Sequence, residues 1–277
     1  MSAIDGETAV AGAAAGATQP GGRVAPFLSA RGISAGYTQV PVVQEVSLEV
    51  GLGEVVLIMG PNGAGKSTLV KALTGALPLL AGSVVLDGED VSRSREDERM
   101  ARGIGYVPQV RDVFPPLTVV ENLEMGAFRM RSAATSARIQ EVFELFPTLE
   151  RLRKRQAKTL SGGERKLLGI ARALMANPRL LILDEPTANL SPLIAATVLE
   201  QTVSKLAGDG RAVLLIEQRV SLGLQVASWG YVLTDGRVRT QQSAGELRAM
   251  EDLSGLFLAA RAKGGAEPRA PRSRRRA

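Results

Sequence analysis

Residues 60–68 read Gly-Pro-Asn-Gly-Ala-Gly-Lys-Ser-Thr and match the pattern G-x-x-x-x-G-K-[ST] at every fixed position. An apolar run at 54–59 precedes them and favours a buried parallel strand, and the residues at 67–74 have helical character. A glycine-rich loop between a strand and a helix directs backbone N–H groups and the positive end of the helix dipole at an anion. The pattern therefore predicts an α/β fold that binds a polyphosphate at this loop.

The predicted phosphate loop also carries a cation and a metal ligand. Lys66 is placed to reach the β- and γ-phosphates, and the Ser67 hydroxyl is placed to coordinate Mg²⁺. We expect Gly60, Gly63 and Gly65 to adopt positive φ, which lets the backbone approach the phosphates closely. The residues expected to bind the ligand are Gly60, Pro61, Asn62, Gly63, Ala64, Gly65, Lys66, Ser67 and Thr68.

The composition limits the chemistry that this site can use. The chain has 277 residues, of which 45% are hydrophobic, and no apolar run reaches the roughly 18 residues that cross a bilayer. Acidic residues precede the small apolar segment 9–17, so we expect a cytoplasmic location and no export signal. The chain has no Cys and no His, which excludes disulfides, thiolate metal sites and an imidazole base. Acid–base chemistry must therefore come from carboxylates.

The two ends of the chain differ in composition from the middle. Residues 1–26 are rich in Ala, Gly and Thr, and residues 261–277 carry the whole formal net charge of +6. We expect both segments to be disordered, with one folded domain over 27–260. The basic tail is open to two interpretations: a solvated end, or a segment that contacts anionic lipid or RNA.

The middle of the chain predicts three structural parts. Alternating apolar residues at 28–37 and 41–50 indicate antiparallel strands in a small β layer. Helical spacing indicates an inserted helical segment at about 110–158, with a capping box at Thr118 and Glu121. Further strands are indicated by short apolar runs at 83–86, 103–107, 180–183, 212–216 and 231–233. We therefore expect a mostly parallel sheet core, an antiparallel β layer and a helical insert.

Polar residues lie at the ends of three of the predicted strands. They are the pair Asp184 and Glu185, and two glutamines, Gln109 and Gln218. Ligands gather at the carboxyl ends of the strands in open α/β sheets. In an ATPase with a phosphate loop, the first acid holds Mg²⁺ through water and the second polarises the attacking water. We therefore expect Asp184 to bind the metal and Glu185 to act as the catalytic carboxylate.

A second candidate anion site opens the helix that follows residue 160. Ser161 and Glu164 have the spacing of a capping box, and Gly162 and Gly163 place two glycines in the first turn, which costs helix stability. A helix start without side chains leaves its N–H groups accessible to an anion. An ordinary capped helix fits the same residues, so both interpretations stay open.

Taken in chain order, four stretches resemble the ATP-binding subunits of ABC transporters: 60–68, Gln109, Leu-Ser-Gly-Gly-Glu at 160–164 and Leu-Leu-Ile-Leu-Asp-Glu-Pro at 180–186. The resemblance spans about residues 27–245. Residues 117–126, 161–175 and 216–218 are similar to the ATPase subunits of branched-chain amino acid importers and their urea or amide relatives. The resemblance implies a P-loop NTPase fold of ABC type and ATP hydrolysis that drives uptake of a small polar solute, with branched-chain amino acids favoured.

The resemblance also implies cofactors and partners. Two ATPase subunits would pair head to tail, with each ATP between the phosphate loop of one and residues 161–164 of the other. Tyr37 would stack on adenine, although a tyrosine beside a turn also fits ordinary packing. Gln109 would contact Mg²⁺ and the attacking water. The helical insert would dock on a membrane permease at the cytoplasmic face, and an extracytoplasmic solute-binding protein would take part indirectly.

Two positions depart from the common family pattern. Ser191 stands where many members carry an Asp, and Gln218 stands where a histidine is usual. We expect the neutral Gln218 amide to orient the attacking water or a γ-phosphate oxygen beside Glu185; the alternative is that it only satisfies a backbone group. The predicted catalytic residues are Lys66, Gln109, Glu185 and Gln218, and the predicted metal-binding residues are Ser67, Gln109 and Asp184.

Other classes of ABC ATPase fit the chain less well. A chromosome-maintenance ATPase would separate Lys66 from Ser161 by a long coiled coil, for which the chain has no room. A ribosome-binding factor would carry two ATP domains, whereas this chain has one phosphate loop. A non-transport ATPase whose basic tail binds nucleic acid remains the alternative, although we do not expect nucleic acid as a partner.

Overall fold

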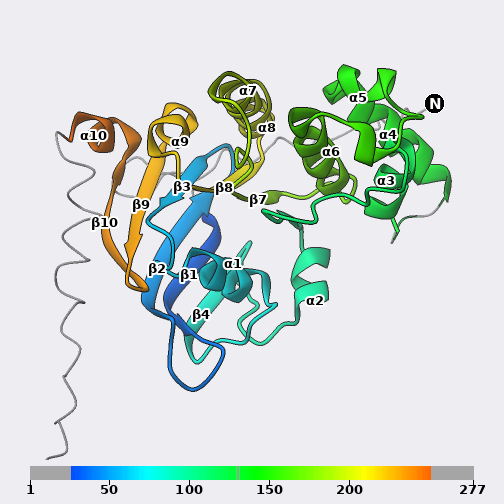
Figure 1. Ribbon diagram of the computed structural model, residues 1–277. Helices are drawn as coiled ribbons and strands as arrows, with labels where there is room; N and C mark the ends of the chain where they lie inside the picture. The colour runs from blue at the N-terminus through cyan, green and yellow to red at the C-terminus, as the bar shows by residue number, and fades with distance from the viewer. Residues whose placement is uncertain (1–25, 129, 131, 251–277) are drawn as a thin grey trace, which may run out of the picture.

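The computed structural model describes residues 26–128, 130 and 132–250, which form two sheets and their covering helices (Figure 1). The order β2-β1-β4-β5 gives an antiparallel sheet, and the order β10-β9-β3-β8-β7-β6 gives a sheet that is parallel except for the edge strand β10. The strands are β1 Pro26–Ala35, β2 Val43–Gly51, β3 Val55–Met59, β4 Ala81–Leu86, β5 Glu89–Asp90, β6 Ile104–Val107, β7 Leu180–Asp184, β8 Ala212–Glu217, β9 Trp229–Thr234 and β10 Arg237–Ser243.

Helices cover the larger sheet and form a separate group at one side of it. They are α1 Lys66–Thr74, α2 Glu96–Ala101, α3 Val119–Gly126, α4 Ser132–Leu145, α5 Pro147–Arg151, α6 Gly162–Leu174, α7 Pro192–Thr197, α8 Ser204–Gly208, α9 Val220–Val226 and α10 Ala244–Ala249. A 3₁₀ turn, η1 Ala157–Thr159, precedes α6, and a π-helical segment, η2 Val198–Val203, joins α7 to α8. The predicted mostly parallel core with an antiparallel β layer is confirmed, whereas β10 and α2 were not predicted.

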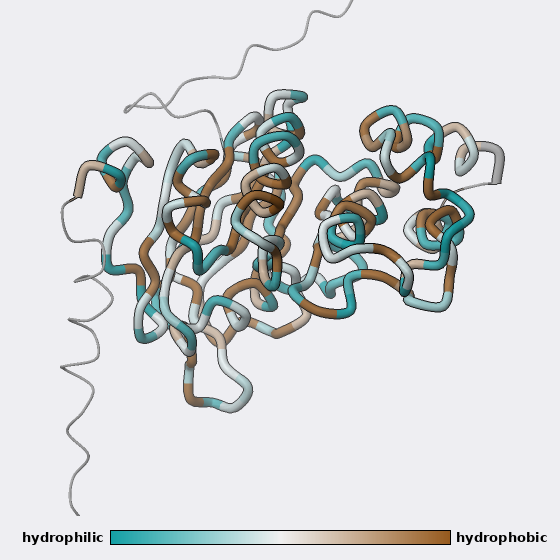
Figure 2. Tube along the Cα trace, turned by 45° about the horizontal axis from the view of Figure 1, so that its top comes forward, coloured by the Kyte–Doolittle hydropathy of each residue, from teal (hydrophilic) through white to brown (hydrophobic). Residues whose placement is uncertain are grey.

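The strand that leads into the phosphate loop has its side chains in two hydrophobic cores. Val56 and Ile58 pack with α1 and the antiparallel sheet, whereas alternate residues such as Leu57 pack with α6, α8 and α9. This division follows from the period of two in a strand, and it explains why β3 is apolar throughout and why β7 and β8 are apolar up to their final acidic residues. Figure 2 shows these central segments mostly in the brown of hydrophobic residues. Packing on both faces therefore holds β3 rigidly.

The predicted helical insert contains α3, α4 and α5, which lie beside α6 in Figure 1. The predicted capping box closes as expected, because the Thr118 hydroxyl accepts the N–H of Glu121 and the Glu121 carboxylate accepts the N–H of Thr118. The residues predicted at helical spacing in α4 and just after it are buried in the core: Ile139, Val142, Phe143 and Phe146. Whether 110–158 is a unit in its own right stays a prediction.

The predictions for the two ends of the chain fall largely outside the described residues. The expected disorder of 1–26 and of the basic tail 261–277, and the domain limit at 260, belong to segments of which only Pro26, the first residue of β1, is described. Within the described residues, no helix is long and apolar enough to cross a membrane.

A buried arginine holds the far end of the phosphate-loop helix. Arg99 of α2 is 1% exposed, and its guanidinium donates to the carbonyls of Ala72 and Leu73 in the last turn of α1, both at 2.8 Å. It also donates to the carbonyls of Ser92 and Ser94 at 3.0 and 3.1 Å. A cation at this position complements the negative end of the helix dipole and satisfies carbonyls that the helix leaves unpaired. Burial lowers the pKa of Arg99.

We expect Arg99→Met to lower the free energy of unfolding by about 2–4 kcal/mol, because four backbone carbonyls would lose their donor inside the protein. Urea denaturation followed by circular dichroism measures this change. Arg102→Met is the matched control, since Arg102 is the exposed C-cap of α2, the helix that carries Arg99, and pairs with Glu89. Equal losses in the two variants would contradict the assignment of this role to the buried guanidinium.

Candidate functional site

The predicted phosphate loop lies between β3 and α1 and opens into a hollow of about 440 Å³. Gly63 and Gly65 have φ of 82° and 97°, as predicted, and Gly65 is the N-cap of α1. The prediction for Gly60 was wrong, since its φ is not positive. A Cβ at Gly60 would lie 2.1 Å from the carbonyl oxygen of Leu233, so this position requires glycine because two backbone segments approach closely.

Lys66 lines this hollow and is 6% exposed. Its Nζ donates to the carbonyls of Gly60 and Pro61 at 2.8 and 3.1 Å, and it lies 3.9 Å from Oε1 of Glu185. Burial lowers the pKa of Lys66, and the charges of Glu185 and other nearby carboxylates oppose this effect. A polyphosphate in the hollow would offer Lys66 stronger acceptors than the loop carbonyls.

The two predicted acids lie at the carboxyl end of β7, as expected. Asp184 is 7% exposed and accepts a hydrogen bond from the Tyr106 hydroxyl at 3.4 Å. Burial, and next the charge of Glu185, raise the pKa of Asp184, and burial beside Asp184 raises the pKa of Tyr106. Glu185 is 8% exposed and has a φ of 49°, a left-handed conformation that is strained for a residue with a side chain. The turn therefore directs Glu185 toward Lys66.

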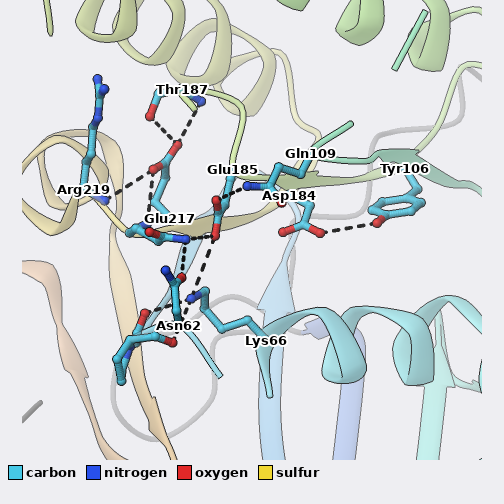
Figure 3. A network of polar contacts seen from close by, with 12 residues as sticks. Asn62, Lys66, Tyr106, Gln109, Asp184, Glu185, Thr187, Glu217 and Arg219 are labelled. Carbon is cyan, nitrogen blue, oxygen red and sulfur yellow. Dashed lines mark hydrogen bonds and ion pairs between the residues drawn. The ribbon is translucent and has the colours of Figure 1, made fainter. Parts of the chain in front are cut away.

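Both predicted glutamines converge on the Glu185 carboxylate. Nε2 of Gln109 donates to Oε2 of Glu185 at 2.5 Å, and Nε2 of Gln218 donates to Oε1. Nε2 of Gln218 also donates to Oδ1 of Asn62 in the phosphate loop at 2.7 Å. Figure 3 shows Gln109 directed toward Glu185, with Asn62 and Lys66 below Glu185. The Gln218 amide thus contacts side chains of the site, and the alternative in which it only satisfies a backbone group is not what the structure shows.

The segment after Gln109 is attached to α6. Nζ of Lys166 donates to the backbone carbonyl of Gln109 at 2.8 Å and forms an ion pair with Asp112 at 3.0 Å. The two side chains are only 12% and 8% exposed, so this pair is poorly screened by solvent. The helix that begins with the predicted second anion site therefore holds Gln109 in place.

Tyr37 lies near the phosphate loop but does not line its hollow. It is 61% exposed, and its hydroxyl accepts a hydrogen bond from Nζ of Lys71 at 3.1 Å. Hydrogen bonds with Lys71 and Thr68 lower the pKa of Tyr37. Thr68 does line the hollow, and stacking of the exposed Tyr37 ring on adenine stays a prediction.

Residues 161–164 lie apart from the phosphate loop. The predicted capping box is present, since the Ser161 hydroxyl accepts the N–H of Glu164 and the Glu164 carboxylate accepts the N–H of Ser161. Ser161, Gly163 and Glu164 line a second hollow of about 220 Å³ with residues of α7 and η2. A single chain therefore does not bring these residues to the phosphate hollow, and their role as a second anion site stays a prediction.

Sequence reasoning missed a buried carboxylate between the two turns of the site. Glu217, the last residue of β8, is 2% exposed and accepts hydrogen bonds from the N–H and hydroxyl of Thr187 at 3.0 and 2.7 Å. Arg219 donates from Nη2 to the carbonyl of Leu190 at 2.9 Å. An acid that ends an otherwise apolar strand was the available signal.

Ser191, the residue that stands where many family members carry an Asp, is the N-cap of α7.

The residues predicted to bind Mg²⁺ have suitable chemistry for it. Ser67 and Gln109 line the phosphate hollow, and Asp184 lies at the strand end next to Glu185. Hydroxyl, amide and carboxylate oxygens suit Mg²⁺ when phosphate and water complete its shell. In the described part of the chain, no three acidic side chains gather into a group that could hold a metal.

Comparisons with known proteins agree with this geometry. The family model described as ABC transporter matches residues 43–188. The branched-chain amino acid transport ATP-binding protein BraG of Pseudomonas aeruginosa is 40% identical over 212 residues, which cover 76% of this chain and 91% of BraG. The probable LivF of Archaeoglobus fulgidus is 37% identical, with 82% and 96% covered. The lipopolysaccharide export ATP-binding protein LptB of Escherichia coli K12 is 35% identical, with 83% and 96% covered.

Solved structures show the same architecture. The ADP conformation of MJ1267, an ATP-binding cassette of an ABC transporter, superposes with a TM-score of 0.77 at 27% identity, covering 85% of this chain and 99% of that one. The dimeric structure of MJ0796, a bacterial ABC transporter cassette, gives a TM-score of 0.68 at 26% identity, covering 78% and 98%. The chain therefore belongs to the ABC transporter family, as an ATP-binding subunit that hydrolyses ATP.

Proposed function

We propose that this chain drives the import of a small polar solute, most specifically branched-chain amino acids, from the cytoplasmic face of a membrane. The observation that carries the proposal is the similarity to BraG and LivF, whose identity to this chain is higher than that of the export protein LptB. A histidine-free site that places Gln218 against Glu185 agrees with the importer branch suggested by the sequence.

The proposed hydrolytic site needs a second ATPase subunit. Residues 161–164 form their own hollow, away from the phosphate loop, so a nucleotide bound at Lys66 would contact them only in a neighbouring subunit. The dimeric cassette MJ0796 provides a precedent for such pairing. We propose that Ser161 and Glu164 of each subunit complete the site of the other.

The proposed chemistry assigns a role to each polar group around Glu185. The Glu185 carboxylate polarises a water molecule, Gln109 and Gln218 orient that water, and Lys66 neutralises charge on the β- and γ-phosphates. Mg²⁺, held by Ser67 and Asp184 together with the phosphates, would supply further positive charge. Every one of these residues except Asp184 lines the same hollow.

The proposed docking surface for a permease lies on the helical insert and its approach. Large apolar side chains are exposed there, and they are Val110, Phe114, Met125 and Phe128, with exposures of 68%, 41%, 45% and 78%. Cζ of Arg172 in α6 lies 4.9 Å from the centre of the Phe114 ring, so a cation–π contact holds this ring in place. Exposed apolar groups of this size are typical of surfaces that bind another protein.

Import of branched-chain amino acids is tested by uptake of labelled leucine, isoleucine and valine into cells that lack this chain. We expect uptake to fall and to be restored by the wild-type chain but not by Glu185→Gln. Integral membrane proteins should copurify with the wild-type chain. Unchanged uptake together with a defect in lipopolysaccharide transport would favour an exporter, and copurification of RNA or DNA alone would favour the non-transport alternative.

We expect Lys66→Ala and Glu185→Gln to separate ATP binding from hydrolysis. Lys66→Ala removes the cation from the phosphate hollow, so it should weaken ATP binding and abolish turnover. Glu185→Gln keeps every phosphate contact but polarises water poorly, so it should bind Mg·ATP, hydrolyse it very slowly and accumulate as a dimer in gel filtration. Fast hydrolysis by either variant would show that its residue has a different role.

Gln218 variants test whether a neutral amide is sufficient beside Glu185. We expect Gln218→Ala to lower kcat by about 10- to 100-fold with a smaller change in ATP affinity, since a positioning contact is lost. Gln218→His should retain activity because it can still donate a hydrogen bond. Gln218→Glu should be worse than Ala, because it places a negative charge against Glu185 and the γ-phosphate. Equal steady-state rates for the wild type and the Ala and Glu variants would exclude Gln218 from the site.

A further inference from the structure

Glu217 is a buried carboxylate that the proposed chemistry does not use. It is the last residue of β8, lies level with Met59 of the phosphate-loop strand in the sheet, and is 2% exposed. An ionised carboxylate at such a position needs several hydrogen-bond donors to compensate for lost hydration. The residues that donate hydrogen bonds to Glu217 therefore show which segments its carboxylate connects.

The donors to Glu217 come from two turns that are far apart in the sequence. Oε1 accepts the N–H and the hydroxyl of Thr187, in the turn after β7, at 3.0 and 2.7 Å. Oε2 accepts the N–H groups of Gln218 and Arg219, in the turn after β8, at 3.2 and 3.5 Å. Figure 3 shows Glu217 between Thr187 and Arg219. One side chain thus links the two turns that carry Glu185 and Gln218.

A second contact joins the same two turns. Arg219 donates from Nη2 to the carbonyl of Leu190 at 2.9 Å. Its guanidinium therefore connects the turn after β8 to the segment after β7, and its N–H donates to the Glu217 carboxylate. The N–H of Glu185 donates to the carbonyl of Ile216 at 2.9 Å, which fixes the start of the first turn against the end of β8. The Glu217 carboxylate adds a further link, because it accepts hydrogen bonds from residues of both turns.

We propose that Glu217 is a positioning residue that sets the geometry of Glu185 and Gln218 by holding the turn at Thr187 against the turn at Gln218. The proposal rests on the proposed catalytic roles of Glu185 and Gln218. A carboxylate suits this task because it only accepts hydrogen bonds, whereas an amide of the same shape would place N–H donors against the N–H groups that surround it. Small displacements of positioned groups reduce turnover strongly while leaving distant binding contacts intact.

The first test is Glu217→Gln in the full chain, with kcat, KM and ATP affinity measured separately. We expect kcat to fall about tenfold or more, while the dissociation constant for ATP changes by less than about twofold, because the phosphate contacts of Lys66 are retained. An unchanged kcat would overturn the proposal, and so would a loss of ATP affinity as large as the loss of kcat.

The second test is independent of whether Glu217→Gln folds well. Thr187→Val removes the hydroxyl that donates to Glu217 and should lower kcat in the same way, whereas Thr187→Ser should restore most of the rate. The matched control is Thr74→Val, since Thr74 is equally buried but its hydroxyl donates to the carbonyl of Lys71 at the far end of α1. A rate loss in the control as large as that in Thr187→Val would overturn the proposal.

A double-mutant cycle then tests whether the two side chains act together. We expect Glu217→Gln combined with Thr187→Val to lower kcat little more than Glu217→Gln alone, and fully multiplicative losses would contradict the link. Lys66→Ala and Glu185→Gln serve as references for the proposed function. If both references abolish hydrolysis and Glu217→Gln does not lower kcat, only the positioning role fails; if the references hydrolyse ATP normally, the proposed function itself fails.

Discussion

The electrostatic balance at the carboxyl edge of the parallel sheet depends on Lys66. Glu185, Asp184 and Glu217 all lie near enough to this buried ammonium group to raise its pKa against the effect of burial. One cation among three carboxylates leaves an excess of negative charge in a partly dry site. The N–H groups of the phosphate loop and the proposed Mg²⁺ would offset this charge when a polyphosphate binds.

The rigidity of that edge comes from the division of β3, β7 and β8 between two cores. Each of these strands is buried on both faces, so the residues at their ends cannot shift without disturbing packing on one side. Arg99 fixes the opposite end of α1, and Lys166 fixes the segment after Gln109. The polar groups of the site are therefore held in place by residues from both sheets and from the helices that cover them.

The sequence was sufficient to predict the phosphate loop and the pair Asp184 and Glu185, because local pattern alone determines them. It also predicted that Gln109 and Gln218 lie at strand ends, since the carboxyl ends of parallel strands share one edge. It did not predict Glu217, because its partner Thr187 is distant in the sequence. The sequence also could not show why position 60 requires glycine, because the reason is the close approach of the Leu233 carbonyl, which is distant in the sequence. Contacts between distant segments leave no periodic signal.

The pairing of β3 has a consequence for the synthesis of the chain. β3 lies between β8 and β9, so the segment that carries the phosphate loop has neither neighbour until residues beyond 212 have left the ribosome. At about 5–20 residues per second, the apolar run Val55–Met59 waits for roughly 8–30 s without its sheet partners. The antiparallel strands β4 and β5 and the helical insert are synthesised within this interval. The nucleotide site is consequently among the last parts of the nascent protein to form.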